Sequence, residues 1–193
     1  MTHRIRQEIA HLESFSKRGE SYSDGKGRYG WRNPIREDTG SLLTALVVAA
    51  SPKRMLEIGT AHGLSALYLV SGMPAGGVLH TIEFDEAVAD DTQRRMDACG
   101  VPVKVLRGEA LQVIAGLEDR YDLVFFDAQK DMYLPQLQAL LAGGLVGPGT
   151  TLLADNVTDR RAECQPFLDW ISANGLRHQI LPTECGLLVA TID

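Results

Sequence analysis

Short apolar runs alternate with longer amphipathic stretches along most of the chain. Five apolar runs are predicted to be strands: 54–58, 78–83, 103–107, 121–127 and 151–154. The stretches that follow them have the apolar spacing of helices: 64–71, 86–99, 111–116, 132–141 and 162–174. Strands that alternate with helices favour right-handed crossovers and parallel pairing. We therefore predict an α/β fold with a doubly wound, mostly parallel sheet.

The two ends of the chain depart from this alternation. Residues 177–181 and 186–191 predict two strands with a short connection, and hence an antiparallel C-terminal hairpin at one edge of the sheet. Residues 2–18 predict a helix, and Asp38 or Thr39 is expected to cap a second helix that ends at Pro52. Residues 19–34 are rich in Gly, Ser and charge and predict a loop. No repeat or boundary divides the chain, so we expect one domain over residues 1–193.

Composition narrows the class of protein. A chain of 193 residues with 45% hydrophobic and 23% charged residues is typical of a globular domain. No apolar run approaches the length of a membrane span, and the first residues lack the apolar centre of a signal peptide. Cys99, Cys164 and Cys185 show neither paired nor zinc-type spacing. We expect a protein of the reducing cytoplasm that has no membrane partner.

Charge is distributed unevenly along the chain. Up to Arg36 there are eight Lys or Arg against four Asp or Glu, a net charge of about +4. Because the whole chain has a net charge of −6, the remaining residues carry about −10. This basic segment also contains Tyr22, Tyr29 and Trp31. It could attract an anionic substrate or nucleic acid, or close over a ligand. The competing interpretations are a solvated helix and loop that happen to be basic, and aromatic residues that pack on the body or on a second subunit.

Polar side chains stand where two of the predicted strands end. The run at 121–127 ends on Asp127, and Asp155 and Asn156 follow the run at 151–154. Open α/β sheets bind ligands at this edge, and three oxygen ligands suit a hard cation such as Mg²⁺, Mn²⁺ or Ca²⁺. Lys130 could place an amine beside that ion. The competing interpretations are acids that merely cap the next helix, and a surface lysine.

The first predicted strand leads into a turn with two glycines, Gly59 and Gly63. Glycines there permit a tight turn and a close approach of the backbone to a ligand. The N–H groups at the start of the next helix would point at that ligand, and Ser65 would add a hydroxyl. Because Ala61 interrupts the Gly-x-Gly-x-x-Gly pattern, a pyrophosphate binder would lack a useful glycine. Glu57 also suits a cationic ligand better than a phosphate, unless it is only a buried acid satisfied by backbone N–H groups.

Two further strand ends extend this site. Glu83 could accept both hydroxyls of a ribose, unless it is a surface acid. Glu109 and Ala110, after the third strand, could contact the edge of an adenine. A dinucleotide and S-adenosylmethionine both fit these features.

Six motifs, in order, carry a resemblance to a known family. They are Leu-Glu-Ile-Gly-Thr-Ala-His-Gly-Leu-Ser (56–65), Thr-Ile-Glu-Phe-Asp (81–85), Gly-Glu-Ala (108–110), Phe-Asp-Ala-Gln-Lys-Asp-Met-Tyr (126–133), Ala-Asp-Asn (154–156) and Leu-Pro-Thr-Glu-Cys-Gly-Leu (181–187). From about Glu37 to its C-terminus, the chain resembles the cation-dependent class I S-adenosylmethionine O-methyltransferases of the catechol and caffeoyl-CoA type. The resemblance implies a Rossmann-like class I methyltransferase fold and a homodimer.

The resemblance also implies a role for each residue of the cofactor site. The residues implied to bind S-adenosylmethionine are Glu57, Gly59 and Ser65 at its amino-acid part, Glu83 at its ribose, Glu109 and Ala110 at its adenine, and Asp127 beside it.

The same resemblance assigns the reaction centre. It implies that Asp127, Asp155 and Asn156 bind the divalent cation, with Mg²⁺ favoured. Lys130 would be the catalytic base, or the cation that stabilises the oxyanion of the methyl acceptor. Residues 1–36 would form a basic segment for acceptor binding or dimerisation.

We therefore expect metal-dependent methyl transfer to a hydroxyl of a small, catechol-like aromatic diol. The same chemistry on a hydroxyuridine of tRNA is the alternative acceptor, and nucleic acid is the less favoured partner. Two further classes are compatible with a cofactor site of this kind. One is a non-catalytic S-adenosylmethionine-binding protein, and the second is a nicotinamide oxidoreductase, which the glycine pattern disfavours. The chain shows no counterpart of the acceptor-specific residues of the plant enzymes, which leaves the acceptor itself open.

Overall fold

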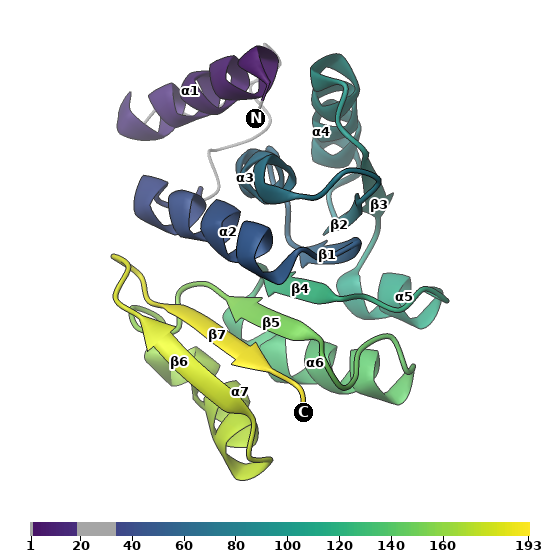
Figure 1. Cartoon of the computed structure of the whole chain (residues 1–193), viewed down its shortest axis with the longest axis vertical. Coiled ribbons are helices and arrows are strands. Elements are labelled where there is room, and N and C mark those ends of the chain that lie inside the picture. The colour runs from purple at the N-terminus through teal and green to yellow at the C-terminus, as the bar shows by residue number, and fades with distance from the viewer. Residues whose placement is uncertain (1, 19–33) are drawn as a thin grey trace.

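A seven-stranded sheet forms the centre of the computed structural model, which describes residues 2–18 and 34–193 (Figure 1). The strands are β1 (Arg54–Ile58), β2 (Val78–Glu83), β3 (Val103–Arg107), β4 (Leu123–Phe126), β5 (Thr151–Ala154), β6 (Arg177–Leu181) and β7 (Leu187–Thr191). Their order is β3-β2-β1-β4-β5-β7-β6. β1 to β5 pair in parallel, whereas β7 runs antiparallel to both β5 and β6. The predicted fold class and the edge hairpin are confirmed.

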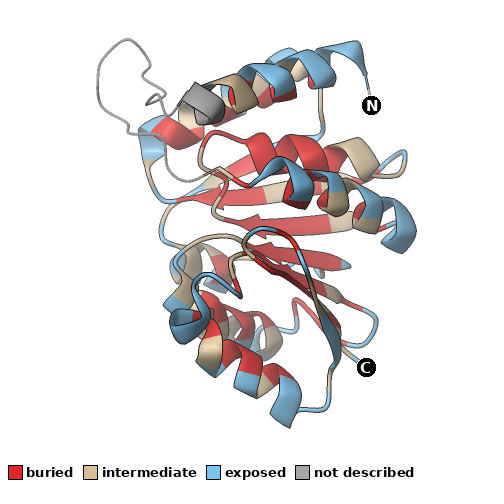
Figure 2. Ribbon diagram, turned by 90° about the vertical axis from the view of Figure 1, so that its left-hand side faces the viewer, coloured by how far each residue is buried: buried red, intermediate tan, exposed pale blue. Residues whose placement is uncertain are grey.

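Helices cover both faces of this sheet (Figures 1 and 2). α1 (His3–Arg18), α2 (Glu37–Ala50), α3 (Leu64–Gly72) and α4 (Glu86–Cys99) lie on one face. α5 (Ala110–Ala115), the 3₁₀ turn η1 (Lys130–Met132), α6 (Tyr133–Ala142) and α7 (Arg161–Ala173) lie on the other. Successive strand residues point to opposite faces, so Met55 and Phe125 join one core while Leu56 and Phe126 join the other. A sheet buried on both faces explains the continuous apolar runs of its strands.

Three details differ from the expectations. α2 begins at Glu37 after Arg36, so Asp38 and Thr39 lie in its first turn and the predicted cap is wrong. Asp38 instead accepts the backbone N–H of Glu184, in the turn between β6 and β7, at 2.9 Å. β4 is shorter than the predicted run 121–127, and just before it the carboxylate of Asp122 accepts the N–H groups of residues 53 and 54 at 2.8 and 2.9 Å. The helix expected at 132–141 is preceded by η1.

The order of the strands places the site. The chain winds outward from β1 through β2 to β3, then returns to the other side of β1 at β4. Ligands bind in open α/β sheets beyond the carboxyl ends of the strands at such a reversal. Gly59 follows β1 there with φ +96°, and a Cβ on it would lie 2.8 Å from the carbonyl oxygen of Asp127. Only glycine allows the turns after β1 and β4 to approach so closely.

Two expectations concern other parts of the chain. No helix of the described ranges is long and apolar enough to cross a membrane. The aromatic residues singled out in the basic segment, Tyr22, Tyr29 and Trp31, lie outside the described residues.

Candidate active site

Neighbouring strand ends bring together the acidic residues of the predicted reaction centre. Phe126, the last residue of β4, pairs with Ala154 of β5. The N–H of Asp155 donates to the carbonyl of Phe126 at 3.1 Å, and the N–H of Asp127 donates to that of Ile58 at 3.0 Å. Asp127 and Asp155 therefore leave adjacent strands at the same level of the sheet.

Lys130, the first residue of the 3₁₀ turn η1, forms an ion pair with Asp127. Its Nζ lies 2.9 Å from Oδ1 of Asp127, and both side chains are only 13% exposed. The same Nζ lies 5.4 Å from the ring centroid of Tyr133, within the range of a cation–π contact. Lys130 is thus a partly buried amine held at the strand end, and the alternative of a surface lysine is wrong.

One carboxylate oxygen of Asp155 is buried without a hydrogen bond from the described part of the chain. The residue is 2% exposed, and its Oδ1 has no hydrogen-bond partner among the described residues. Burial and the neighbouring Asp127 carboxylate raise the pKa of Asp155 to about 7. Burial likewise raises the pKa of Asp127, against the opposing effect of Lys130. Two buried, mutually repelling carboxylates are costly unless positive charge lies between them.

The donor set at this edge fits a hard divalent cation. Asp127 and Asp155 offer carboxylate oxygens, and Asn156 offers an amide oxygen. Asn156 has a left-handed backbone, φ +63°, which turns the chain sharply after β5. Over the described ranges, no group of three or more His, Cys, Asp or Glu side chains could hold a metal ion. The set here has two carboxylates and one amide, and its uncompensated oxygen is the observation that favours a cation.

Glu57 is a further buried acid of the site. It is fully buried, and its Oε2 accepts the hydroxyl of Thr81 at 2.5 Å. Its Oε1 finds no hydrogen-bond partner in the part of the chain that the structure describes. Burial raises the pKa of Glu57 to about 7, although the hydroxyls of Ser65 and Thr81 oppose the rise. A cationic group of a ligand would relieve this uncompensated oxygen.

Glu83 holds the glycine turn against the end of β2. Its two carboxylate oxygens accept the N–H groups of Ala61 and Asp85, each at 3.0 Å, and the residue is 5% exposed. The alternative of a surface acid is therefore wrong. Phe84, directly after it, is a large apolar residue that is 61% exposed.

The remaining cofactor candidates lie at helix starts. Gly63 precedes α3 in a left-handed conformation with no side-chain cap, and Ser65 is buried in the first turn. Glu109 is exposed and caps α5 by accepting the N–H of Gln112 at 3.1 Å. Ala110 beside it is half-buried. The structure gives Glu109 a local capping task, and its contact with an adenine stays a prediction.

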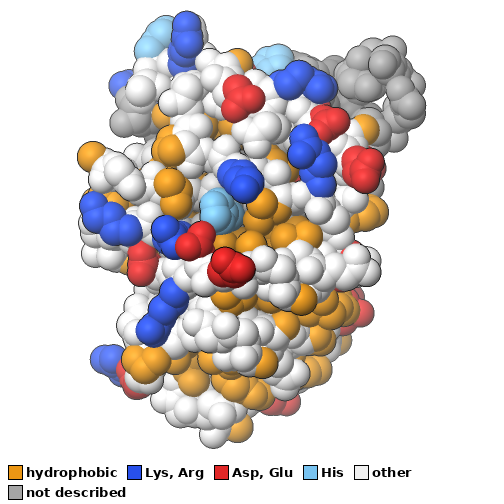
Figure 3. Space-filling model, turned by 90° about the vertical axis from the view of Figure 1, so that its right-hand side faces the viewer, with side chains coloured by type: hydrophobic (Ala, Val, Ile, Leu, Met, Phe, Trp, Pro, Cys, Tyr) orange, Lys and Arg blue, Asp and Glu red, His pale blue; other side chains and the backbone are white. Residues whose placement is uncertain are grey.

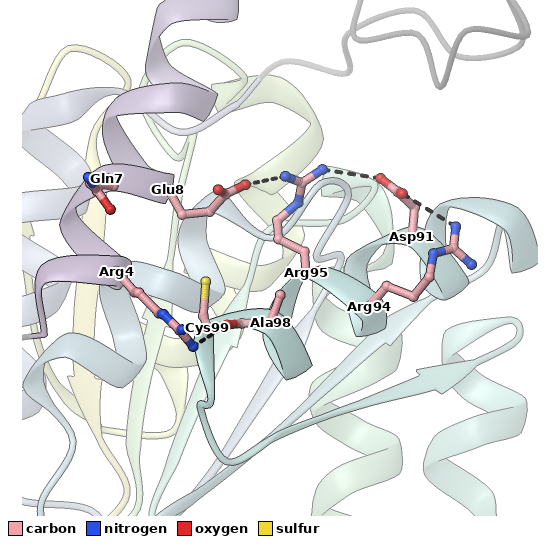
Figure 4. A pocket seen from close by; sticks show the side chains of 8 residues that line it. All are labelled: Arg4, Gln7, Glu8, Asp91, Arg94, Arg95, Ala98 and Cys99. Carbon is pink, nitrogen blue, oxygen red and sulfur yellow. Dashed lines mark hydrogen bonds and ion pairs between the residues drawn. The ribbon is translucent and has the colours of Figure 1, made fainter.

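A hollow of about 380 Å³ lies elsewhere, between α1 and α4 (Figure 4). Its charged walls are engaged within the chain, since Arg95 pairs with Glu8 and Asp91 and Arg4 donates to the carbonyl of Ala98. These contacts hold α1 against α4. None of the predicted site residues lines this hollow.

Comparison with known proteins places the chain in a family. A family model described as O-methyltransferase matches residues 28–171, more than half of the chain. The chain belongs to the O-methyltransferase family. It is 34% identical to the catechol O-methyltransferase of Bos taurus over 151 residues, which is 75% of this chain and 55% of that protein. It is 31% identical to the catechol O-methyltransferase of Niastella koreensis over 64% of this chain and 58% of that protein.

Solved structures of O-methyltransferases share the fold. A Bacillus cereus O-methyltransferase in complex with SAH matches with a TM-score of 0.80 at 22% identity, covering 100% of this chain and 92% of that one. The O-methyltransferase TomG from Streptomyces achromogenes, in complex with SAM, matches with a TM-score of 0.80 at 22% identity, over 100% and 90% of the two chains. These matches confirm the predicted fold, and the family model confirms the resemblance to O-methyltransferases. The chain spans about half the length of the curated relatives it matches.

Proposed function

We propose that this chain is an S-adenosylmethionine-dependent O-methyltransferase that uses a divalent cation to methylate a hydroxyl of a small, catechol-like aromatic. The observation that carries the proposal is the pair of carboxylates, partly buried Asp127 and buried Asp155, with Lys130 beside them at the reversal of strand order. Membership of the O-methyltransferase family and the names of its catechol O-methyltransferase relatives support it.

The turns after β1, β2 and β3 would bind S-adenosylmethionine. Glu57 would compensate its buried Oε1 with the ammonium of the methionine part, next to Gly59 and Ser65. Glu83 would accept the ribose hydroxyls with the lone pairs that its two N–H contacts leave open. Glu109 and Ala110 would flank the adenine.

Asp127, Asp155 and Asn156 would hold the cation, with Mg²⁺ the first choice and Mn²⁺ or Ca²⁺ the alternatives. A bound divalent cation would lower the pKa of a vicinal hydroxyl pair and fix its orientation. The chain itself supplies the rest. As an ammonium, Lys130 would stabilise a negatively charged acceptor oxygen, and as a neutral amine it would take up the proton of the hydroxyl. The rigid strand ends align the reactants for a single displacement.

The experiment that tests this function measures transfer of a labelled methyl group from S-adenosylmethionine to 3,4-dihydroxybenzoate. We expect transfer with Mg²⁺ and its loss with excess EDTA. 3-Hydroxybenzoate, which lacks the vicinal hydroxyl, is the matched acceptor and is expected to remain unmethylated. Equal transfer with EDTA would refute the cation, and equal transfer to the monohydroxy acceptor would refute the diol.

The proposal extends to partners and location. We expect a homodimer in the cytoplasm, with residues 1–36 serving acceptor binding or dimerisation. On the face drawn in Figure 3, Lys and Arg side chains are interspersed with Asp and Glu, so the described residues offer no broad basic surface for RNA on that side. Light scattering of the purified chain tests the dimer, and a mass of about one chain would refute it.

A further inference from the structure

Asp159 lies beyond the Ala-Asp-Asn motif and binds its last member. The side-chain amide nitrogen of Asn156, Nδ2, donates to Oδ1 and Oδ2 of Asp159 at 3.2 and 3.3 Å. The backbone around this contact is also tied down, because the carbonyl of Asn156 accepts the N–H of Arg160 at 3.0 Å. The side-chain amide is therefore the part of Asn156 whose orientation Asp159 controls.

An amide can serve a cation with one end only. Its oxygen is a ligand, whereas its NH₂ group carries partial positive charge and would repel a cation. A carboxylate is only an acceptor, so Asp159 binds the NH₂ end of Asn156 and disfavours the flipped amide. The oxygen end is then the one left for the neighbouring donors.

A separate observation indicates that a cation belongs beside this amide. Asp155, the residue directly before Asn156, is 2% exposed and keeps its Oδ1 without a hydrogen bond among the described residues. That oxygen needs a positively charged or hydrogen-bonding partner that the described part of the chain does not supply.

We propose that Asp159 is a positioning residue for the cation site, which presents the amide oxygen of Asn156 to the ion through its two contacts with Nδ2. The inference rests on the proposed function, because it assumes that Asp127, Asp155 and Asn156 hold a divalent cation. Asp159 is exposed and acts from outside the ligand set. Partners that orient a ligand in this way are typically worth about 10–100-fold in metal affinity.

Three variants separate orientation from simple charge. Asp159→Ala removes both contacts, whereas Asp159→Asn removes the negative charge and keeps a carbonyl oxygen that can accept one N–H. Glu163→Ala is the matched control, since Glu163 is an exposed carboxylate four residues along the chain that pairs with Arg160 at 2.8 Å.

The measurement is Mn²⁺ binding to the full chain in the absence of S-adenosylmethionine, from the electron paramagnetic resonance signal of free Mn²⁺ at about 0.15 M salt. We expect Asp159→Ala to weaken binding by about 10–100-fold, Asp159→Asn to stay within about fivefold of wild type, and Glu163→Ala within about twofold. Thermal melts without metal check that all variants fold alike.

The outcomes distinguish this inference from the proposed function. Equal Mn²⁺ affinities in wild type and Asp159→Ala would overturn the inference and leave the cation-dependent function standing. Equal losses in Asp159→Ala and Asp159→Asn would overturn it too, because charge alone would then account for the effect. Wild type that binds no Mn²⁺ would overturn both.

Discussion

At the scale of single residues, Glu57 combines a cost to the stability of the ligand-free fold with a proposed role in cofactor binding. The carboxyl is fully buried with a pKa of about 7 in the folded chain, against an ordinary value of 4.5. Because the pKa is higher in the folded chain than in the unfolded chain, the protonated carboxyl makes the fold more stable than the ionised carboxylate would. This contribution is complete below pH 4.5. That contribution is lost as the pH rises to about 7. The ligand-free fold then loses on the order of 3 kcal/mol.

Glu57→Gln removes the titration, so its effect on stability is expected to change with pH. Relative to wild type, the variant should melt about 5–10 °C higher at pH 8 and within a few degrees at pH 5, in the absence of ligand. It should also bind S-adenosylmethionine more weakly at pH 8, because the ammonium loses its carboxylate. Melting curves and calorimetric titration at both pH values check this. A melting difference that is the same at pH 5 and pH 8 would contradict the buried-acid account.

Lys130 acts at the reacting atoms in either of its proposed roles. Lys130→Ala is expected to lower kcat by about 10²–10⁴-fold, while affinity for S-adenosylmethionine stays within a few-fold. Asp131→Ala is the matched control, because Asp131 is exposed in the same 3₁₀ turn. Steady-state rates and equilibrium binding separate the two effects. A Lys130→Ala enzyme with wild-type kcat would remove Lys130 from the chemistry.

At the scale of elements, Gly59 determines how closely the turns after β1 and β4 meet. A Cβ at Gly59 would lie 2.8–2.9 Å from backbone atoms of Asp127 and Ala128, at a φ of +96°. Gly76 offers the matched control, since it has φ +77° and a Cβ added there would meet nothing within 4 Å. Gly76→Ala therefore carries only the conformational cost, about 1–2 kcal/mol. Gly59→Ala must in addition push two strand ends apart.

We expect Gly59→Ala to lower the free energy of unfolding by at least about 1 kcal/mol more than Gly76→Ala, and to weaken cofactor binding as well. Urea denaturation of both variants, with parallel titrations of S-adenosylmethionine, makes the comparison. Equal losses of stability would show that the turn after β1 can accommodate a side chain at position 59, and would contradict the view that this turn is rigid.

At the scale of the whole molecule, much of the architecture follows from local sequence. A parallel sheet buried on both faces requires continuous apolar strands, and those runs locate β1 to β5 within a few residues. The strand-end acids could be placed together because parallel strands present their carboxyl ends at one edge. The ion pair between Asp127 and Lys130 could also be predicted, because the two residues are only three positions apart in the sequence.

Contacts between distant segments could not be predicted in this way. Asp38 accepts the N–H of Glu184 across 146 residues, and no periodicity links the start of α2 to the turn between β6 and β7. Likewise, the hydrogen bonds of Asn156 to Asp159 depend on a left-handed backbone at a residue that is not glycine. Such a turn carries a weak sequence signal, because Asn adopts that conformation only occasionally.

A cation bound as proposed would couple this edge of the sheet to the stability of the whole fold. A ligand that binds only the folded chain stabilises it by RT ln(1 + [L]/Kd), about 2.7 kcal/mol at one hundred times Kd. We expect Mg²⁺ to raise the melting temperature of wild type by several degrees relative to EDTA, because it relieves the repulsion between Asp127 and Asp155. Asp155→Ala lacks half of the carboxylate pair, so its melting temperature should be the same with Mg²⁺ and with EDTA. A rise of equal size in both proteins would place the cation somewhere other than the strand ends.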